Sequence, residues 1–541
     1  MNEKSIVKNR YFLYVTAFFS GMSIMAIELG ASRLLAPYFS SSQIVWTVII
    51  GTIMIALALG NVIGGRIADK DPNPDKLYRR MFIAAVWTAL IPFLGKYVIL
   101  AITGLLVLFV KSNLLIWAAL ASCFVLFVFP LLLLGTVTPS LMKFCVSSLE
   151  NNGKIMGEIE ALGTIGSIIG TFLPTFVTIP TVGTATTFLI FAGALTLICL
   201  IYFVSVRRRF IRTVVVLVLI IVCFFVPFKD SFAFWEPNLL YEGESIYNYL
   251  QVKEDDKSVI LMTNVLFGVQ SIMMKDEVLT GFYYEYALAG PLMAGFELAD
   301  EGLDASDKEL LILGLGSGTY AGLVEHYFGN VHIEGVEIDE KITLLAEEYF
   351  NLNTDNVDVI VDDGRAYLQT GNTKKYDIIL CDAYQDITIP FQMASVEFFE
   401  LCKEHLKEDG ILIVNMNMRS SREGAMNDYL CDTVASVYGD CYTVVIPSIT
   451  NTLLFTSNGM DVKAALSTNL ERLDEKDAIY PLMHFVNDNM RYVEAGELIL
   501  TDDKAPVELL GMKVIDDIIN DNLAYYRKLL KEQGIQGLLG N

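Results

Sequence analysis

The sequence predicts a protein of two parts, a multi-pass bundle of membrane-spanning α-helices followed by an α/β domain built on a doubly wound parallel sheet. Long apolar runs continue to residue 227, and from residue 309 strand-like segments alternate with helix-like ones. The charge changes too, since residues 1–228 carry 17 basic and 8 acidic side chains and residues 229–541 carry 22 and 54. We therefore expect a transmembrane helical domain at 1–228, a linker and small β-region at 229–300, and the α/β domain with a C-terminal extension at 301–541.

Seven apolar runs account for the first part. Hydrophobic residues make up 53% of the chain and charged residues 19%, which is apolar for a soluble protein. Most runs reach the roughly 20 residues with which a helix crosses about 30 Å of hydrocarbon, and the first is too long for a removable signal peptide. Seven such runs in succession are not typical of buried core helices. The runs lie at 12–36, 44–65, 81–110, 114–142, 157–180, 183–205 and 211–227.

Charged residues inside these runs are candidates for function, because a charge is costly in hydrocarbon. Glu28 and Arg33 share the first run, and Glu158 and Glu160 open the fifth. They can form a pathway or a headgroup site. The alternative is that they form a neutralised pair that locks helix packing, or lie at the membrane interface.

Glycines predict a close contact between two of the helices. Gly163, Gly166 and Gly170 recur along the fifth run at near-helical spacing. Small residues at this spacing let two helix backbones approach each other.

The acidic second part excludes some partners. Its negative charge repels nucleic acid and favours cationic ligands, although diffuse acidity also serves solubility alone. The eight cysteines form no CxxC pair, and the four histidines show no metal-ligand spacing. We therefore expect no nucleic-acid partner, no disulfide framework and no metal.

The α/β pattern begins with a glycine loop. Residues 310–313 predict a short buried strand, which runs into Gly314-Leu315-Gly316-Ser317-Gly318 and then a helix-like segment at 319–328. Glycines at such a place let the backbone approach a ligand at a helix N-terminus. The third glycine comes one residue too early for the GxGxxG of dinucleotide sites, and the phosphate-binding Lys of GxxxxGK[ST] is missing.

Three further predicted strands end in acidic residues. An acid after the second strand can accept both ribose hydroxyls of a nucleoside, and one after the third can accept from an adenine amino group. Because the carboxyl ends of parallel strands share one edge of a sheet, these signals together predict a site for an S-adenosylmethionine-type cofactor. The alternative is that the acids cap helices or solvate loops. The strands 332–336, 357–361 and 376–381 end at Glu337-Ile338-Asp339, Asp362-Asp363-Gly364 and Asp382-Ala383-Tyr384.

These residues resemble the spermidine synthase (polyamine aminopropyltransferase) family, and over nearly the whole chain they are similar to its membrane-fused branch. The resemblance implies a Rossmann-like fold of the class I S-adenosylmethionine-dependent transferase type, preceded by a small β-region. The similar segments are 247–252, 268–270, 282–285, 337–339, 363–364, 376–379, 382–384, 389–390, 397–399 and 500–508, with Pro139, 163–166 and 179–180 in the first part.

The resemblance implies transfer of an aminopropyl group from decarboxylated S-adenosylmethionine to an amine such as a polyamine. It places Asp382 as the group that deprotonates or orients the amine, with Tyr284 aligning it. A carboxylate suits that task, because an ammonium is not a nucleophile until it loses a proton. The implied cofactor-binding residues are Gly314, Gly316, Ser317, Gly318, Glu337, Ile338, Asp363 and Gly364, and the implied substrate-binding residues are Gln270, Tyr283 and Asp386.

Two positions depart from the family pattern. The family's glycine loop carries an Asp that pairs with the donor's free amine, and this chain has Ser317 there. Serine does not repel the carboxylate of intact S-adenosylmethionine, so the donor is open. The residues around Asp386 also differ from the soluble synthases, which leaves the acceptor open.

Two other functions therefore stay open. One is a methyltransferase that uses intact S-adenosylmethionine on a lipid or small molecule. Many methyltransferases have an acid at the position of Ile312, so this residue disfavours that function. The other is a transporter that senses a nucleoside without turnover. The expected partners are an amine or lipid substrate and the membrane, with a homodimer left open.

Basic residues indicate how the first part is oriented. They precede the first run and fill the loops from the second to the third and from the sixth to the seventh, whereas the alternate loops carry almost none. The positive-inside rule then puts the N-terminus in the cytoplasm. Seven crossings would leave the α/β domain outside the cell, whereas the cofactor favours the cytoplasm. We expect a cytoplasmic α/β domain on the cofactor argument.

Overall fold

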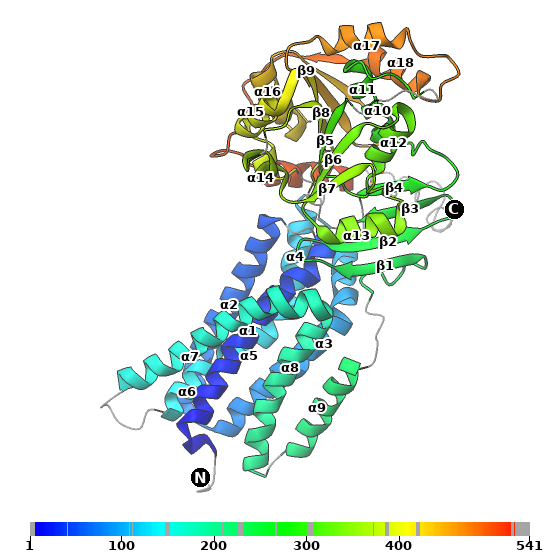
Figure 1. Cartoon of the computed structure of the whole chain (residues 1–541). Helices are drawn as coiled ribbons and strands as arrows, with labels where there is room; N and C mark the ends of the chain where they lie inside the picture. Colours follow the sequence, from blue (N-terminus) through cyan, green and yellow to red (C-terminus); the bar gives the residue numbers. More distant parts are fainter. Residues whose placement is uncertain are drawn as a thin grey trace. The chain divides into compact units, whose positions relative to one another are not determined.

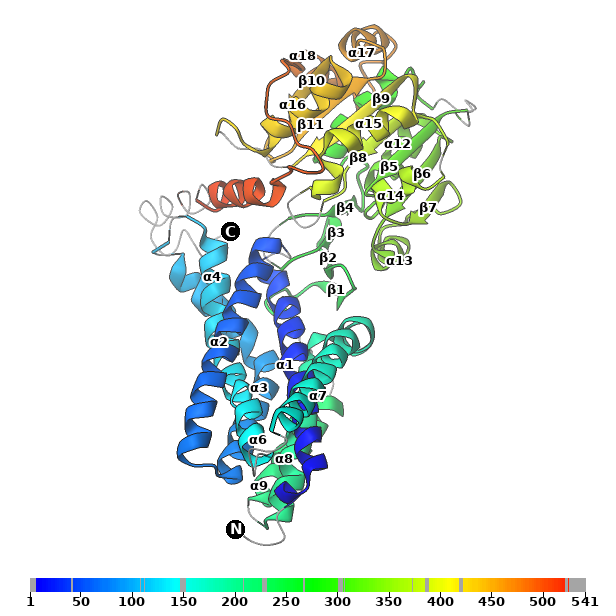
Figure 2. The same ribbon diagram turned by 90° about the vertical axis from the view of Figure 1, so that its left-hand side faces the viewer.

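The computed structural model describes residues 6–39, 42–107, 109–110, 112–145, 152–207, 209–225, 231–265, 268–299, 305, 307–371, 373–384, 389–417, 422–520 and 524. Its contacts divide the chain into two compact units, one helical and one α/β, which are drawn in two views in Figures 1 and 2. The helical unit comprises Met1–Pro237, Gly243–Tyr249 and Asn264–Leu266, and the α/β unit comprises Asn238–Glu242, Leu250–Thr263 and Phe267–Asn541.

Helices corresponding to the seven apolar runs make up the helical unit. Among the described residues, five helical stretches are long and apolar enough to cross a membrane, and the longest, Gly153–Ser205, is kinked at Gly183, whose φ is 80°. The helix of the third run continues without a break through Gly95 and Lys96. The helices are α1 (Arg10–Phe39), α2 (Gln43–Lys70), α3 (Pro74–Leu106), α4 (Leu114–Cys123), α5 (Phe129–Gly135), α6 (Val137–Cys145), α7 (Asn152–Leu173), α8 (Ile179–Ser205) and α9 (Phe210–Phe225), with π-turns at Phe124–Val128 and Pro174–Thr178.

Helices α1 and α7 touch through their backbones, as the glycine spacing predicts. A Cβ at Gly166 would stand 2.0 Å from the carbonyl oxygen of Phe18, and one at Gly170 would stand 2.1 Å from that of Met22. Gly21 faces back toward α7, since its Cβ would stand 2.2 Å from the Gly163 carbonyl oxygen. No side chain larger than hydrogen fits these positions unless the helices separate.

The two ends of the helical unit differ in charge. Arg66 and Lys70 close α2, and Arg209 follows α8 at the same end, because α2 and α8 end where α1 and α3 begin. At the opposite end lie residues 231–237 and 243–249 of the same unit. There Lys96 donates to the Ser231 carbonyl oxygen at 3.0 Å, and Thr184 donates to the Glu244 carboxylate through its N–H at 2.9 Å.

Helix α9 brings the chain to that opposite end. Its Ile220 packs against Leu189 and Ala192 in the first half of α8 and against Ala89 of α3. Helices α8 and α9 are therefore antiparallel, since α9 begins next to the end of α8 (Figure 1).

Charged residues from the first and fifth runs have polar partners in the helical unit. The Arg33 guanidinium donates to the carbonyl oxygens of Ser245, at 3.1 Å, and of Ile246. Glu158 accepts a hydrogen bond from the Tyr14 hydroxyl, and Glu160 is exposed.

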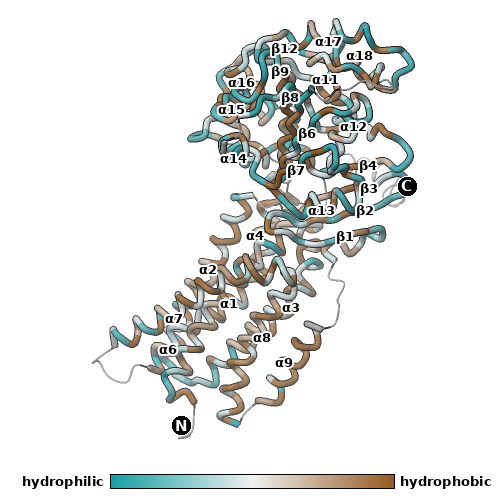
Figure 3. Tube along the Cα trace, viewed as in Figure 1, coloured by the Kyte–Doolittle hydropathy of each residue, from teal (hydrophilic) through white to brown (hydrophobic). Residues whose placement is uncertain are grey.

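Apolar side chains point outward from the helical unit. Met54 and Ile55 of α2 are 60% and 61% exposed, and Ile211 and Leu219 of α9 are 66% and 56% exposed. In Figure 3 the apolar colour runs along these helices, whereas in the α/β unit it is concentrated in the strands. Apolar surface of this extent is not typical of a protein face that meets water.

The α/β unit begins with a four-stranded antiparallel sheet in the order β1-β2-β3-β4. Alternate side chains of this sheet, among them Leu250 and Leu261, pack on Ile342 and Leu345 of α13 (Glu340–Tyr349). The sheet is thereby fixed over the loops that follow the first strands of the larger sheet. Its strands are β1 (Leu239–Glu244), β2 (Tyr249–Glu254), β3 (Ser258–Met262) and β4 (Ser271–Met274).

The larger sheet has eight strands in the order β12-β10-β11-β9-β8-β5-β6-β7. Strands β5 to β9 are parallel, and the chain switches direction between β5 and β8, which are hydrogen-bonded neighbours. This confirms the doubly wound sheet that the sequence predicts, with an antiparallel edge added. The strands are β5 (Glu309–Leu313), β6 (His332–Glu337), β7 (Val357–Val361), β8 (Tyr376–Cys381), β9 (Leu406–Met416), β10 (Cys441–Val445), β11 (Thr452–Ser457) and β12 (Arg491–Val493).

Helices cover both faces of this sheet. One core holds Tyr320 and Val324 against Ile312 and Ile413, and the other holds Phe398 and Leu430 against the opposite side of the same strands. The first face carries α10 (Tyr283–Ala287), α11 (Ala289–Met293), α12 (Thr319–Phe328), α17 (Val462–Leu470) and α18 (Tyr480–Asn489); the second carries α14 (Gly364–Gln369), α15 (Val396–His405), α16 (Met426–Tyr438) and a helix at 507–520.

Candidate active site

The glycine loop lies at the switch point, between the ends of β5 and β8. Gly314 has a φ of 95°, and a Cβ there would stand 2.5 Å from the carbonyl oxygen of Asp382. The Asp382 N–H in turn donates to the Leu313 carbonyl oxygen at 2.9 Å. The glycine is therefore needed for two reasons, its backbone angle and the close approach of the next strand end.

Strand β4 holds the other side of the loop. The Ser317 N–H donates to the Ser271 hydroxyl at 3.0 Å, and the Thr319 hydroxyl donates to the Ile272 carbonyl oxygen at 2.9 Å. Ser317 is buried, its hydroxyl lies 3.2 Å from that of Thr319, and the residue borders a cavity of about 270 Å³. Ser271 was missed from the sequence, because nothing in its own segment marks it as a partner of a loop 46 residues away.

Glu337 ends β6 beside the loop, as predicted. Its carboxylate accepts from the Gly316 N–H at 3.0 Å and from the Asp339 N–H at 3.1 Å. Burial raises the pKa of Glu337 to about 7, against the effect of these backbone bonds. Each oxygen keeps lone pairs with which a carboxylate can accept hydroxyl groups of a sugar.

Asp363 lies at the predicted strand end and also caps a helix, which was the alternative role given for these acids. Its Oδ1 accepts from the N–H groups of Arg365 and Ala366, at 3.0 and 2.9 Å, at the start of α14. Both bonds go to one oxygen, so Oδ2 takes no bond from the part of the chain that the structure describes. The cap holds the carboxylate in place at the end of β7, next to Gly364.

The C-terminal segment braces this turn. Arg365 forms a two-pronged ion pair with Asp502, with Nη1–Oδ1 and Nη2–Oδ2 distances of 2.7 and 2.6 Å. Ser395 donates to the same carboxylate at 2.6 Å. The family-like segment 500–508 therefore supports the turn that carries Asp363, which sequence reasoning had not assigned to it.

Asp382 ends β8 and is held by two neighbours. Its Oδ1 accepts from the side-chain amide of Asn415 at 2.7 Å, and its Oδ2 accepts from the Tyr283 hydroxyl. The residue keeps some exposed surface, but protein surrounds it closely, and this burial raises the pKa of Asp382 to about 7. A carboxylate with that pKa can exchange a proton at neutral pH.

The two neighbouring tyrosines have different partners. The Tyr284 hydroxyl donates to the Gln270 carbonyl oxygen at 3.0 Å, and the rings of Tyr283 and Tyr284 lie 4.1 Å apart. The resemblance assigned Tyr284 to aligning the amine and Tyr283 to substrate binding, and in the structure the Tyr283 hydroxyl contacts Asp382. Residues 283 and 284 lie in the single turn α10, where adjacent side chains diverge by about 100°, and the sequence does not say which of the two faces the strand end.

Asp386, the third predicted substrate-binding residue, lies outside the described residues. Ile338 lies beyond Glu337 at the end of β6 and is 38% exposed, and Gln270 lies next to β4.

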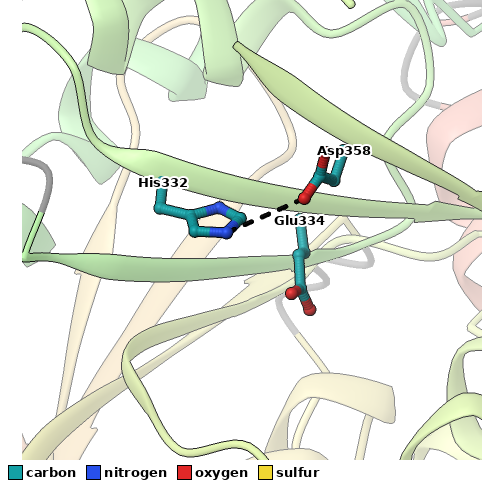
Figure 4. Close-up of side chains that lie close together, drawn as sticks. All are labelled: His332, Glu334 and Asp358. Atoms are coloured by element: carbon teal, nitrogen blue, oxygen red, sulfur yellow. Dashed lines mark ion pairs between the residues drawn. The ribbon is translucent and has the colours of Figure 1, made fainter.

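Among the described residues, one group of acidic and histidine side chains is close enough to share a metal ion, and it lies away from the strand ends just described. Figure 4 shows His332 of β6 facing Asp358 of β7, with a Nε2–Oδ2 distance of 3.7 Å, and Glu334 beside them. The Glu334 carboxylate already accepts from Lys374 at 2.7 Å and from the hydroxyls of Tyr367 and Tyr376 at 2.7 and 2.5 Å. Its oxygens are therefore engaged by donors in an ion-pair network.

Comparison with known proteins shows which family this chain resembles. Residues 294–464 match the spermine/spermidine synthase domain. A probable polyamine aminopropyl transferase of Bifidobacterium longum is 48% identical over 358 residues, which are 63% of this chain and 77% of that protein. The polyamine aminopropyltransferase of Vibrio vulnificus is 28% identical over 226 residues, which are 40% of this chain and 71% of that protein.

The fold and the acids at its strand ends define a transferase with a Rossmann-like domain. The chain belongs to the spermidine synthase (polyamine aminopropyltransferase) family. Among solved structures, a probable spermidine synthase of Corynebacterium glutamicum aligns with 47% of this chain and 90% of its own length, at 19% identity and a TM-score of 0.37.

Proposed function

We propose that the protein transfers an aminopropyl group from decarboxylated S-adenosylmethionine to an amine of the polyamine class, with Asp382 as the proton acceptor. The observation that carries the proposal is the contact of Asp382 with Tyr283 at the switch point, next to the glycine loop. The relatives named above are polyamine aminopropyl transferases, which supports the same reaction class.

The proposed reaction is a single displacement. The acceptor's ammonium gives a proton to Asp382, and the amine lone pair attacks the aminopropyl carbon that is bonded to sulfur. The carbon–sulfur bond breaks, its electron pair stays on sulfur, and the sulfonium becomes a neutral thioether. Alignment of the two reactants supplies much of the rate, because it replaces an encounter in solution.

Other residues would hold the donor. Glu337 would accept the ribose hydroxyls, Asp363 would accept from the adenine amino group through Oδ2, and Gly314 would form the turn beside the donor. Tyr283 would steady Asp382 and border the acceptor, whereas Tyr284 would support the loop at Gln270.

One observation favours a second candidate, a transferase that uses intact S-adenosylmethionine. Ser317 provides no carboxylate for the donor's amine, and its hydroxyl lies next to Thr319. The test uses the full-length protein in detergent with each donor and a panel of amines, and mass spectrometry of the products. A mass gain of one aminopropyl group supports the main proposal; methylated product from the intact donor would overturn it. The variant Asp382→Asn controls for contaminating activity.

We also propose that the helical unit lies in a membrane. Its outward apolar side chains and the five long apolar stretches support this. Recovery in the membrane fraction after washing with alkaline carbonate is the expected result, and release into the supernatant would contradict it.

We propose further that the α/β unit lies on the face opposite the basic loops, which is the non-cytoplasmic face under the positive-inside rule. Support comes from α9, which runs antiparallel to α8, and from residues 231–237 of the helical unit, which lie at the end away from Arg66 and Arg209. The cofactor argument favours the other face, a cytoplasmic α/β unit, and a reporter decides between the two. A phosphatase reporter that works only outside the cytoplasm, fused after Asn541, should be active; activity only of a cytoplasmic reporter would refute the placement.

A further inference from the structure

Asp382 lies at one end of a chain of side-chain amides that the proposed reaction does not use. Asn415 of β9 donates from Nδ2 to Asp382 Oδ1 at 2.7 Å, and Asn451 donates from Nδ2 to Asn415 Oδ1 at 2.9 Å. Asn415 is 2% exposed and Asn451 is 7% exposed. Buried amides of this kind are held in place by their hydrogen bonds, because an unsatisfied one would be costly.

The orientation of both amides follows from the carboxylate of Asp382, at the end of this series of hydrogen bonds. An ionised carboxylate only accepts hydrogen bonds, so Asn415 must turn its NH₂ group to Asp382 and its oxygen away. That oxygen only accepts, so Asn451 must turn its own NH₂ group toward it. Asn451 therefore fixes the orientation of the Asn415 amide, and a rotated Asn415 would set oxygen against oxygen at Asp382.

The backbone around the chain is tied to the same strand end. The Tyr384 hydroxyl donates to the Asn415 carbonyl oxygen and accepts from the Asn417 N–H at 2.8 Å. Residue 384 lies two positions after Asp382, so the ends of β8 and β9 are joined both by side chains and through this tyrosine. Thr450, next to Asn451, donates to the Asn417 side chain at 2.8 Å and takes no part in the amide chain.

We propose that Asn415 and Asn451 are positioning residues that hold the Asp382 carboxylate ready to receive the acceptor's proton. The proposal rests on the function proposed above. Asn415 occupies one oxygen from the side of the sheet, and the Tyr283 hydroxyl approaches the other. The proton from the acceptor is then directed to Oδ2. The Tyr283 hydroxyl beside Oδ2 can turn to accept a hydrogen bond from the protonated oxygen, whereas the amide NH₂ beside Oδ1 can only donate.

The chain also favours the ionised carboxylate, since an amide N–H stabilises the charged form more than the neutral one. When Asn451 no longer orients Asn415, Asp382 should hold its proton to higher pH. A purely structural role for Asn451 would lower stability without moving the pH dependence. The pH profile is therefore the measurement that separates the two roles.

The test compares three variants in the full-length protein. Asn451→Asp keeps the size of the side chain but replaces its donor with an acceptor, and Asn451→Leu removes the polar group. Thr450→Val is the matched control, because it breaks a hydrogen bond in the same loop outside the chain. Donor affinity, kcat, KM for the amine and the melting temperature are measured for each from pH 6 to 9.

For Asn451→Asp we expect kcat to fall about 10-fold or more, by analogy with the residues that orient metal ligands through a hydrogen bond. We also expect the acidic limb of the kcat profile to move up by about one pH unit, through the introduced carboxylate and the lost orientation. Donor affinity should not change, and Thr450→Val should behave like the parent. Asn451→Leu should lower kcat in the same way with a smaller pH shift.

An unchanged kcat and acidic limb in both Asn451 variants would overturn the proposal. If one variant does not fold, the other decides. Failure of the proposed function looks different, since then the parent protein itself would transfer no aminopropyl group to any amine.

Discussion

The two units use glycine for different physical reasons. In the helical unit Gly166 and Gly170 have ordinary helical backbone angles, and what matters is the missing Cβ, which lets two backbones touch. In the α/β unit Gly314 and Gly318 have φ values of 95° and 80°, so the backbone angle itself selects glycine. The same residue type thus serves packing in one unit and a ligand-facing turn in the other.

The units also dispose their apolar side chains in opposite ways. The helical unit exposes residues such as Met54 and Leu219, whereas the α/β unit buries its apolar strands between two helical layers. The difference shows that apolar content alone does not locate a core. It is the pattern along each element that does so.

The largest expected effect is on turnover. Asp382→Asn should lower kcat by about 10²–10⁴-fold, the usual contribution of a general base. Donor affinity by calorimetry should be kept, because Glu337 and Asp363 are untouched, and the melting temperature above pH 7 should not fall, since a buried charge is removed. Full turnover in this variant would contradict the assigned role.

In the helical unit the largest effect should come from Gly170→Val. Its side chain would meet the Met22 carbonyl oxygen, and overpacking of this kind costs about 1–3 kcal/mol. Thermal unfolding in detergent measures the loss. Gly157→Val is the control, because a Cβ there meets nothing within 4 Å. Equal melting temperatures for Gly170→Val and Gly157→Val would contradict a role of the close contact at Gly170 in stability.

Substitution of the two tyrosines tests which hydroxyl supports Asp382. Tyr283→Phe should lower kcat by about 10-fold, since a hydrogen bond to a charged group is worth about 1.5–3 kcal/mol. Tyr284→Phe should change kcat less, because its hydroxyl donates to the Gln270 carbonyl oxygen. Steady-state kinetics of the pair give the answer, and a larger loss in Tyr284→Phe would restore the assignment made from the sequence.

A further expected effect is a pH dependence confined to the α/β unit. The pKa of Asp382 is raised to about 7 by burial, so the group is protonated and inactive below that pH. We expect kcat to fall about tenfold per pH unit below pH 7 and to level off above it. Burial also raises the pKa of Glu337 to about 7, so its protonation should weaken donor binding over the same pH range. Calorimetry with the donor alone, without the amine, measures this effect separately. A kcat independent of pH from 5 to 8 would exclude Asp382 as the titrating base.

Much of the site was predictable from local patterns. Glu337, Asp363 and Asp382 each follow an apolar strand directly, so their common edge follows from the geometry of parallel strands. The partners Ser271, Asn415, Asn451 and Asp502 were not predictable, because each reaches the site from a distant segment through one side-chain bond. A single bond of this kind between distant segments leaves no periodic pattern in the sequence.

The sequence by itself determined the seven apolar runs, the glycines of the α1–α7 contact and the order of strands and acids, because all of these depend on residue type and spacing. Tertiary structure alone decided that the Tyr283 hydroxyl meets Asp382, that Arg33 contacts a loop some 210 residues away, and that α9 returns antiparallel to α8. These outcomes depend on how elements pack, and packing is set by the whole set of competing contacts rather than by any segment alone.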